Sequence, residues 1–419
     1  MIGKDIYWYG VQAISLIEKG TLHSQDISPV FYLVSVIFKI FGKSENSLLI
    51  FQIFTAIWLF ISIFFSRILI FKNCKKAVYF IPTIALLIIA FLYPKQSWAL
   101  GFLIICIGFY HITNKKARLL GMSISFLLSF WFHMMVGFFG IGIWILFKLP
   151  KKYYLFLFIF FFLLTIIIPK SPDSRFYNSN EWFTIRIAYG IAGLGILWEW
   201  FLLVLSKREN GQEEGTLNFT GFLMIIPIFH FADIQYRILL SLILIVQIYI
   251  HFGKLQIIFW IIGCSLWIYS FYSEPNLFRY SYEQMLFPGE KISKISNNGL
   301  LIAHHGFCEY YHFNFGKECL SWKPDEKALS ELPIGTKIYR AIYGIRYENL
   351  KISLDGNKNP TFSYILPLGE YQLVLEDEWE QYLKSLEKRE SKNLLIAKSW
   401  KNPYRQRPNF LKRKHLYGF

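Results

Sequence analysis

Residues 47–71 read SLLIFQIFTAIWLFISIFFSRILIF, and this stretch decides the fold class. Arg67 is its only charged residue. The run is also longer than the roughly 20 residues that a helix needs to cross the hydrocarbon core of a bilayer. We therefore expect a transmembrane helix here, and the sequence on its C-terminal side repeats the pattern.

Nine more apolar runs follow this one. The ten together cover residues 47–71, 77–93, 98–112, 119–131, 134–147, 153–169, 183–206, 217–231, 238–252 and 255–271. Several are short for a span, so flanking Tyr, Trp and Lys side chains would have to reach the membrane interfaces. We predict an all-α polytopic membrane helical bundle of about ten spans over residues 46–273.

The composition supports this fold class. Hydrophobic residues make up 54% of the chain and charged residues only 17%, which is low for a soluble globular protein. A net charge of +16 could indicate nucleic-acid binding. However, the basic residues sit in short clusters between apolar runs, as in cytoplasmic loops, so we expect membrane lipid and no nucleic acid as a partner.

The loop charges also predict an orientation, because short cytoplasmic loops carry an excess of Lys and Arg. One set of loops holds Arg67, Lys72, Lys75, Lys76, Lys115, Lys116, Arg118, Lys148, Lys151, Lys152, Lys207 and Arg208. The alternate set, around Lys95 and residues 170–182 and 232–237, carries little positive charge. We expect the first set of loops to face the cytoplasm and the protein to lie in a bacterial inner (plasma) membrane. An even number of spans then puts both chain ends outside.

The N-terminal residues 1–45 do not resemble spans. In residues 5–19, Ile6, Tyr9, Ala13, Leu16 and Ile17 share one helical face, with Gln12, Ser15 and Lys19 opposite, which predicts an amphipathic helix at the membrane surface. A second helix is expected from Ser28 as N-cap and Pro29 as first position to a stop at Gly42. We expect both helices on the outer surface.

From residue 274 to 419 the pattern predicts a small mixed α/β soluble domain. Strands are expected from Gly299, Thr336 and Glu370, and an exposed helix from Glu376. The His304–His305 pair would point to opposite faces of a strand, so we assign no metal site to it with Cys308 and His312. Cys308 and Cys319 can pair in an oxidising compartment. The basic tail after Trp400 either contacts anionic head groups or is solvated.

The N-terminal pattern resembles the first extracytoplasmic loop of the GT-C glycosyltransferases, which are polyprenyl-phosphate-dependent membrane enzymes. The resemblance rests on Asp5 in DIYWYG, a short helix, the polar turn GTLHSQD and the helix SPVFYLVSVIFKIFG. It covers about the first seventy residues and the general layout with a C-terminal outer domain. GT-C enzymes place a membrane helix before this Asp, whereas only MIGK precedes it here. Either a first span lies upstream of Met1 or the chain lacks one.

The resemblance implies that Asp5 is the catalytic carboxylate. Sugar transfer from a polyprenyl-phosphate-linked sugar to a glycan or glycolipid acceptor needs a base for the acceptor hydroxyl. Asp26 would be an acceptor or metal contact, which leaves a divalent cation open as a cofactor. The alternatives are that Asp5 caps the helix it precedes and that Asp26 caps the next one.

Transfer also needs cations that hold the phosphate leaving group, and three candidates fall on the predicted outer side. They are Lys95, His133 and Arg237. The alternatives are interfacial snorkelling for Lys95, a helix–helix hydrogen bond for His133 and pairing with Asp233 for Arg237.

Two rival functions stay open. The segment KQSWA at Lys95 and the later Phe132-His133 also resemble motifs in one branch of the Wzy-type polysaccharide polymerases, although those enzymes usually carry their large loop between spans. A transporter for a lipid-linked sugar is the second rival. Transporters tend to place charges or broken helices at mid-membrane, whereas here the ionisable groups lie near the helix ends.

Overall fold

The computed structural model describes residues 5–24, 26–72, 82–148, 184–205, 207–208, 213–225, 232–251, 254–273, 299–303, 305–317, 319–320, 337–343, 365–368 and 371–375, together with Tyr153, Phe156, Ile159 and Leu163. These residues are mostly helical. Most of the predicted span over 153–169 lies outside them, as do residues 170–182, His304, the predicted helix from Glu376 and the basic tail.

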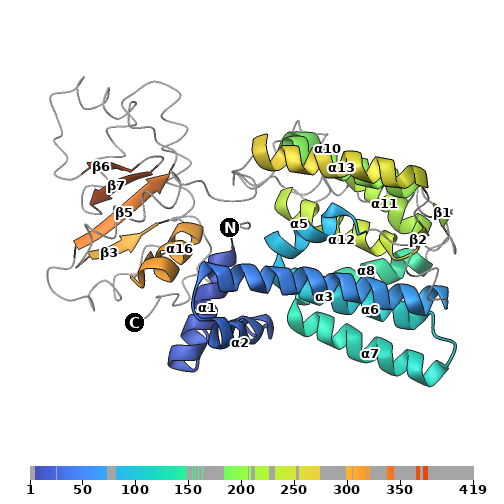
Figure 1. Cartoon of the computed structure of the whole chain (residues 1–419), viewed down its shortest axis with the longest axis horizontal. Helices are drawn as coiled ribbons and strands as arrows, with labels where there is room; N and C mark the ends of the chain where they lie inside the picture. The colour runs from blue at the N-terminus through green and yellow to red at the C-terminus, as the bar shows by residue number, and fades with distance from the viewer. Residues whose placement is uncertain are drawn as a thin grey trace. The chain divides into compact units, whose positions relative to one another are not determined.

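The chain divides into two compact units (Figure 1). The helical unit holds the elements within Ile27–Phe278, and the mixed unit holds those within Lys4–Asp26 and Arg279–Phe419. The predicted N-terminal segment 1–45 is thereby divided, since its first helix belongs to the mixed unit and its second to the helical unit.

The helical unit contains ten helices among its described residues and one pair of two-residue strands. The helices are α2 (Val30–Phe41), α3 (Glu45–Phe71), α5 (Ile84–Leu92), α6 (Pro94–Tyr110), α7 (Lys115–Phe132), α8 (Met134–Lys148), α10 (Thr184–Leu205), α11 (Glu213–Ile225), α12 (Ala232–Gln247) and α13 (Lys254–Ser273). The antiparallel strands are β1 (Lys207–Arg208) and β2 (Ile250–His251). Apart from the run at 153–169, every predicted apolar run overlaps one of helices α3 to α13.

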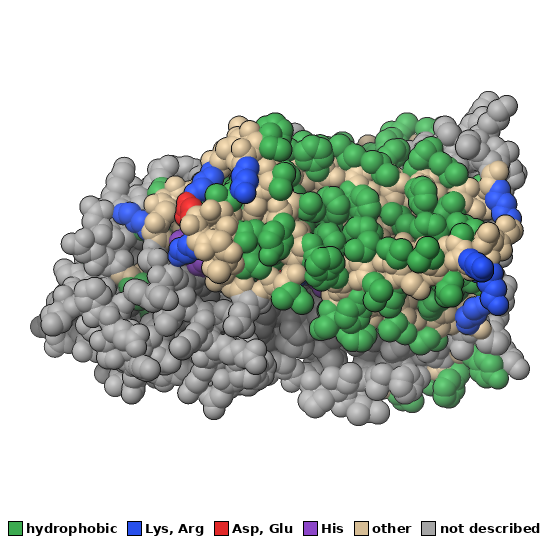
Figure 2. All heavy atoms as spheres, turned by 90° about the horizontal axis from the view of Figure 1, so that it is seen from below, with side chains coloured by type: hydrophobic (Ala, Val, Ile, Leu, Met, Phe, Trp, Pro, Cys, Tyr) green, Lys and Arg blue, Asp and Glu red, His purple; other side chains and the backbone are tan. Residues whose placement is uncertain are grey.

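Helix α3 is, within the described part of the chain, the one helix both long and apolar enough to cross a membrane, with a mean hydropathy of 2.4 over its best window. Its polar side chains are buried, among them Gln52, Thr55 and Ser62. Its exposed side is apolar and includes Ile53 and Ile61. Figure 2 shows hydrophobic side chains spread over one face of the helical unit. This distribution is the reverse of that in a water-soluble helix.

Helices α3 and α6 approach closely because small residues and paired tryptophans line their contact. The Trp58 and Trp98 rings stack with centroids 5.0 Å apart. Further along, the Ser66 hydroxyl donates to the Ile104 carbonyl at 2.8 Å. A Cβ atom on Gly108 would lie 2.8 Å from the Ser66 Cα, so only glycine fits at this crossing.

The mixed unit contains a five-stranded sheet in the order β4-β3-β5-β7-β6. Its strands are β3 (Gly299–Ile302), β4 (Cys319–Leu320), β5 (Lys337–Tyr343), β6 (Ile365–Leu368) and β7 (Tyr371–Leu375). Strand β3 runs parallel to β4 and β5, whereas β7 is antiparallel to β5 and β6. The three strands expected from the sequence correspond to β3, β5 and β7.

Helix α1 (Ile6–Lys19) packs against α16 (His305–Phe315) inside the mixed unit. Its Tyr7 ring meets the Tyr310 ring edge-on with centroids 5.0 Å apart. The prediction of an exposed polar face on α1 is wrong for Gln12 and Ser15, which are both buried. The reason is that the following turn folds back: the Gln12 amide donates to the Ser24 hydroxyl at 2.6 Å.

Two further local expectations are wrong. Helix α2 begins at Val30 with Pro29 at the N-cap position, one residue later than expected. The Ser28 hydroxyl donates to the Phe132 carbonyl at 2.8 Å. The expected stop at Gly42 is confirmed, with a left-handed φ of 81°. In the mixed unit, His305 begins a helix rather than continuing strand β3, which ends at Ile302.

Candidate functional site

Lys95, His133 and Arg237 lie in one network of contacts at a single end of the helical unit. Each is partly exposed. Lys95 is the second residue of α6, and its ammonium group lies 5.9 Å from the centre of the Phe31 ring on α2. Phe31 is one turn after Ser28 on the same chain segment, and Ser28 bonds to the residue before His133.

His133 occupies the break between α7 and α8. Its extended backbone, with φ −157° and ψ 102°, ends α7. Its carbonyl then accepts from the Val136 N–H at 2.9 Å and so starts α8. The Ser28 bond to Phe132 holds this break beside the start of α2. His133 is therefore fixed at a helix junction by backbone contacts on both sides.

Arg237 joins the same end from α12. Its guanidinium carbon lies 4.0 Å from the centre of the Tyr93 ring, which directly precedes α6. Gln96, one turn into α6, donates to the Ser241 hydroxyl at 3.1 Å. Tyr93 and Gln96 thus tie Arg237 to the segment that carries Lys95. Asp233, the alternative partner, lies one turn earlier in α12.

The opposite end of the same helices carries the basic loops. Arg67, near the end of α3, donates to the carbonyls of Gln247, Ile248 and Ile250, where α12 ends. His111, just after α6, lies 3.2 Å from the Tyr249 hydroxyl. We call this the basic end, and define it by the ends of α3, α6, α8 and α12, the start of α7, and β1–β2.

Three more contacts join the elements that make up the basic end. Arg208 in β1 pairs with Ile250 in β2. The Phe147 ring of α8 meets the Tyr249 ring edge-on at 6.1 Å. The Lys148 ammonium donates to the Tyr110 hydroxyl at 3.0 Å. All predicted cytoplasmic clusters that the structure describes therefore lie at this end, away from Lys95 and Arg237.

The separation between the two ends follows from helix geometry. Lys95 and Tyr110 stand at opposite ends of α6, about 22 Å apart along its axis at 1.5 Å per residue. Arg237 and Gln247 are likewise separated along α12. The cluster of Lys95, His133 and Arg237, which we call the outer cationic cluster, thus lies one helix length from the basic end.

Two members of this cluster lie in a stretch without acidic residues. Residues 46–172 contain no Asp or Glu, so α5 to α8 and all of α3 beyond Glu45 contribute no negative side chain. Arg237, in contrast, has Asp233 four residues before it on α12. Elsewhere in the helical unit, Glu199 of α10 is a buried carboxylate. It accepts from the Ala85 N–H at 3.1 Å and from the Trp267 indole N–H at 3.1 Å. Glu199 therefore caps the start of α5.

The two predicted carboxylates belong to the mixed unit. Asp5 is exposed immediately before α1 and makes no side-chain capping bond. Its carbonyl accepts from the Trp8 N–H at 3.1 Å. Asp26 is partly exposed, and its N–H donates to the Ser24 carbonyl at 2.8 Å. Helix α2 has Pro29 at its N-cap position, three residues after Asp26.

The mixed unit also contains a disulfide between Cys308 of α16 and Cys319 of β4, which answers the question that the sequence left open. Nearby, the His312 and His23 rings lie with centroids 5.3 Å apart. In the part of the chain that the structure describes, no group of three or more His, Cys, Asp or Glu side chains is placed to hold a metal ion. His304 lies outside the described residues.

The chain matches no protein-family model, no curated protein and no solved structure. Sequence reasoning missed two polar anchors of the helical unit, Arg67 and Glu199. The sequence pattern places Arg67 among the charges of the cytoplasmic loops, yet Arg67 is fully buried within α3. The signal that could have identified both is an ionisable residue inside an otherwise apolar helix.

Proposed function

We propose that the chain is an integral protein of a bacterial inner membrane, with its basic end in the cytoplasm. The support is the reversed distribution on α3, with polar side chains inside and apolar side chains outside, and the gathering of basic loops at one end. In this proposal the helical unit is a bundle of about ten spans. The mixed unit, with its disulfide, is extracytoplasmic.

On this basis we propose a membrane glycosyltransferase of the GT-C type that moves a sugar from a polyprenyl-phosphate donor to a cell-envelope acceptor. The observation that supports it best is the outer cationic cluster. Lys95, His133 and Arg237 lie at one end of the helical unit, linked through Phe31, Ser28 and Tyr93. In the proposal, the donor phosphate emerges from the outer half of the membrane at this end. Lys95 and His133 lie in residues 46–172, which contain no Asp or Glu, and this suits binding of a phosphate leaving group.

The proposed reaction assigns a role to each residue. The acceptor hydroxyl oxygen attacks the anomeric carbon of the donor sugar, and the bond from that carbon to the phosphate oxygen breaks. Asp5 accepts the hydroxyl proton as general base. The electron pair of the broken bond stays with the phosphate oxygen, so the released polyprenyl phosphate gains a negative charge, which the outer cationic cluster stabilises. Asp26 contacts the acceptor or a divalent cation.

The test is the substitution Asp5→Asn. Losing a general base costs roughly 10²–10⁴-fold in rate, so glycan transfer should fall by about that factor. The Asp5 side chain makes no capping bond, and Asn caps as well as Asp, so the fold and membrane insertion should be unchanged. Glu18→Gln, at an exposed position of the same helix, is the matched control and should transfer normally.

The measurement is transfer of a radiolabelled sugar from the polyprenyl-phosphate donor in membranes of a strain that lacks the native gene. Near-normal transfer by the Asp5→Asn variant would exclude Asp5 as the base. Equal losses in the Asp5→Asn and Glu18→Gln variants would show general damage to α1 instead, and would also contradict the assignment.

A further inference from the structure

Tyr93 stands alone between α5 and α6, and hydrogen bonds hold its backbone on both sides. Its N–H donates to the Ile89 carbonyl at 2.9 Å, and its carbonyl accepts from the Ser97 N–H at 2.9 Å. Tyr93 is therefore both the position after the end of α5 and the position before the start of α6. The backbone that carries its ring is fixed two residues before Lys95.

The Tyr93 ring covers one face of the Arg237 guanidinium group on α12. The guanidinium carbon lies over the ring, 4.0 Å from its centre. A cation at this distance is attracted by the negative face of the ring. A guanidinium group is planar and its N–H groups point outward in that plane, so a ring against one face leaves the edge of the group able to form paired hydrogen bonds.

A second contact fixes the backbone of Arg237. Gln96 of α6 donates to the Ser241 hydroxyl of α12 at 3.1 Å, and that hydroxyl donates to the Arg237 carbonyl at 2.8 Å. Gln96 and Ser241 are both buried, so these bonds are shielded from water. The start of α6 thus holds Arg237 at two points, its side chain through Tyr93 and its backbone through Gln96 and Ser241.

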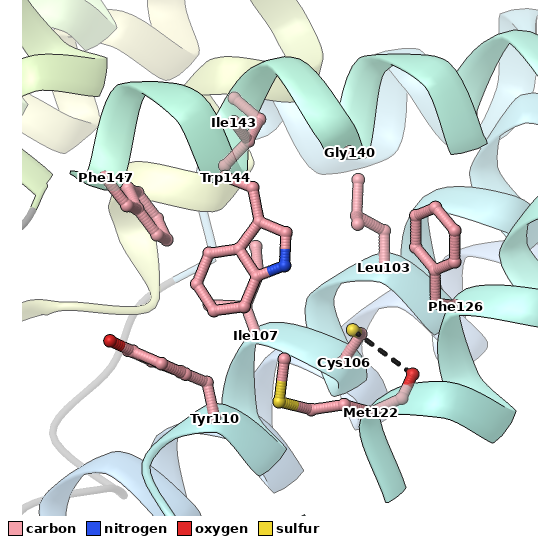
Figure 3. A pocket seen from close by; sticks show the side chains of 10 residues that line it. All are labelled: Leu103, Cys106, Ile107, Tyr110, Met122, Phe126, Gly140, Ile143, Trp144 and Phe147. Atoms are coloured by element: carbon pink, nitrogen blue, oxygen red, sulfur yellow. Dashed lines mark hydrogen bonds between the residues drawn. The ribbon is translucent and has the colours of Figure 1, made fainter. Parts of the chain in front are cut away.

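Close packing of α6, α7 and α8 gives this arrangement a rigid support. Figure 3 shows Leu103 of α6, Phe126 of α7 and Gly140 of α8 around a narrow space. A Cβ atom on Gly140 would lie 2.7 Å from Leu103 Cδ1 and 3.4 Å from Phe126 Cε2, so the three helices have little room to move. The segment that carries Tyr93 is therefore held in place relative to the α7–α8 junction at His133.

We propose that Tyr93 is a positioning residue of the outer cationic cluster. It holds the Arg237 guanidinium group in the orientation in which its paired N–H donors bind the phosphate of the polyprenyl donor. An arginine side chain without such a contact samples many rotamers, and ordering it during binding weakens affinity. Contact with the ring reduces that loss before the phosphate binds. This role rests on the proposed function, in which Arg237 meets the donor phosphate.

The experiment measures binding of farnesyl phosphate, a short polyprenyl phosphate, to the full chain purified in mild detergent. Tyr93→Leu should weaken binding about tenfold, because a contact between a cation and a ring contributes about that factor where water is excluded. Tyr93→Phe keeps the ring and should bind like the wild type. Tyr32→Leu, at an exposed position of α2, is the matched control and should also bind like the wild type.

A double substitution separates positioning from a general structural role. With Arg237→Gln already present, Tyr93→Leu should cause no further loss of binding, because the group that the ring holds is gone. Tyr93→Met removes the ring with a more flexible side chain and should weaken binding as much as Tyr93→Leu. It therefore tests the same contact if the leucine variant does not fold.

Binding by a folded Tyr93→Leu or Tyr93→Met variant that equals wild-type binding would overturn the role of Tyr93. So would an equal loss in the Tyr93→Phe variant, or a further tenfold loss when Tyr93→Leu is added to Arg237→Gln. In these cases the wild type still binds farnesyl phosphate, so the proposed phosphate site stands. A wild type that does not bind farnesyl phosphate would overturn the proposed phosphate site and the role of Tyr93 together.

Discussion

Arg67 is a buried charge held by backbone carbonyls at the basic end. Its guanidinium donates to three carbonyls at 2.7–3.2 Å and lies 4.8 Å from the centre of the Phe71 ring. These carbonyls follow the last turn of α12, where no further helical N–H group reaches them. Arg67 thus donates to carbonyls at the end of α12, just as Glu199 accepts from a backbone N–H at the start of α5.

Arg67→Leu should therefore be strongly destabilising. Each buried carbonyl left without a donor costs about 1–3 kcal/mol, so the free energy of unfolding should fall by at least about 3 kcal/mol. Thermal unfolding of the purified protein in detergent measures the effect. Lys115→Leu removes a charge from the same end at an exposed position and should change stability little. Equal stability of the Arg67→Leu and Lys115→Leu variants would contradict the role given to Arg67.

Arg237 offers the most direct test of phosphate binding at the residue scale. Arg237→Gln keeps a planar group beside Tyr93 but removes the charge and the paired donors that match a phosphate. We expect turnover to fall about 10²-fold and binding of polyprenyl phosphate to weaken. Lys115→Gln, at the basic end, should change neither quantity. Normal binding by the Arg237→Gln variant would remove Arg237 from the proposed site.

The helices of the helical unit could be predicted from the sequence because their apolar runs are long compared with the polar loops. The contacts between side chains that are distant in the sequence could not be predicted. The burial of Gln12 depends on Ser24, and the packing of Tyr7 depends on Tyr310, about three hundred residues further along the chain. Because these contacts cannot be seen in the local pattern, the sequence predicts an exposed polar face on α1, whereas Gln12 and Ser15 are buried. The candidate cations could be selected from the sequence, but the contacts that join them through Phe31 and Tyr93 could not.

The contact between α3 and α6 gives a prediction at the element scale. Membrane helices pack closely where small residues face each other, and Gly108 faces the backbone of Ser66. Gly108→Val would place its Cβ 2.8 Å from the Ser66 Cα, so the helices must separate and the bond from Ser66 to Ile104 must lengthen. We expect a loss of about 1–3 kcal/mol in stability. The measurement is the temperature at which the protein leaves the monodisperse peak in size-exclusion chromatography.

Gly142→Val is the control for this substitution. It introduces the same β-branched side chain into a helix, but at a position with open space around the Cβ atom. Only the difference in helix propensity should remain, and because valine is a slightly better helix former than glycine, stability should rise by well under 1 kcal/mol. If the Gly142→Val and Gly108→Val variants lose the same stability, helix propensity rather than the α3–α6 contact would explain the result.

At the scale of the whole molecule, the positions of charge and disulfide predict one orientation. Loops with excess Lys and Arg stay in the cytoplasm, and the clusters that the structure describes all lie at the basic end. A disulfide such as Cys308–Cys319 persists in an oxidising compartment. These two observations are independent, since one concerns the helical unit and the other the mixed unit. Each agrees with the proposal that the mixed unit lies outside the cytoplasm.

Reporter fusions test this orientation. A reporter that is active only outside the cytoplasm should be active after Phe419 and inactive when inserted between Lys148 and Lys152. Equal reporter activity at both positions would refute the orientation.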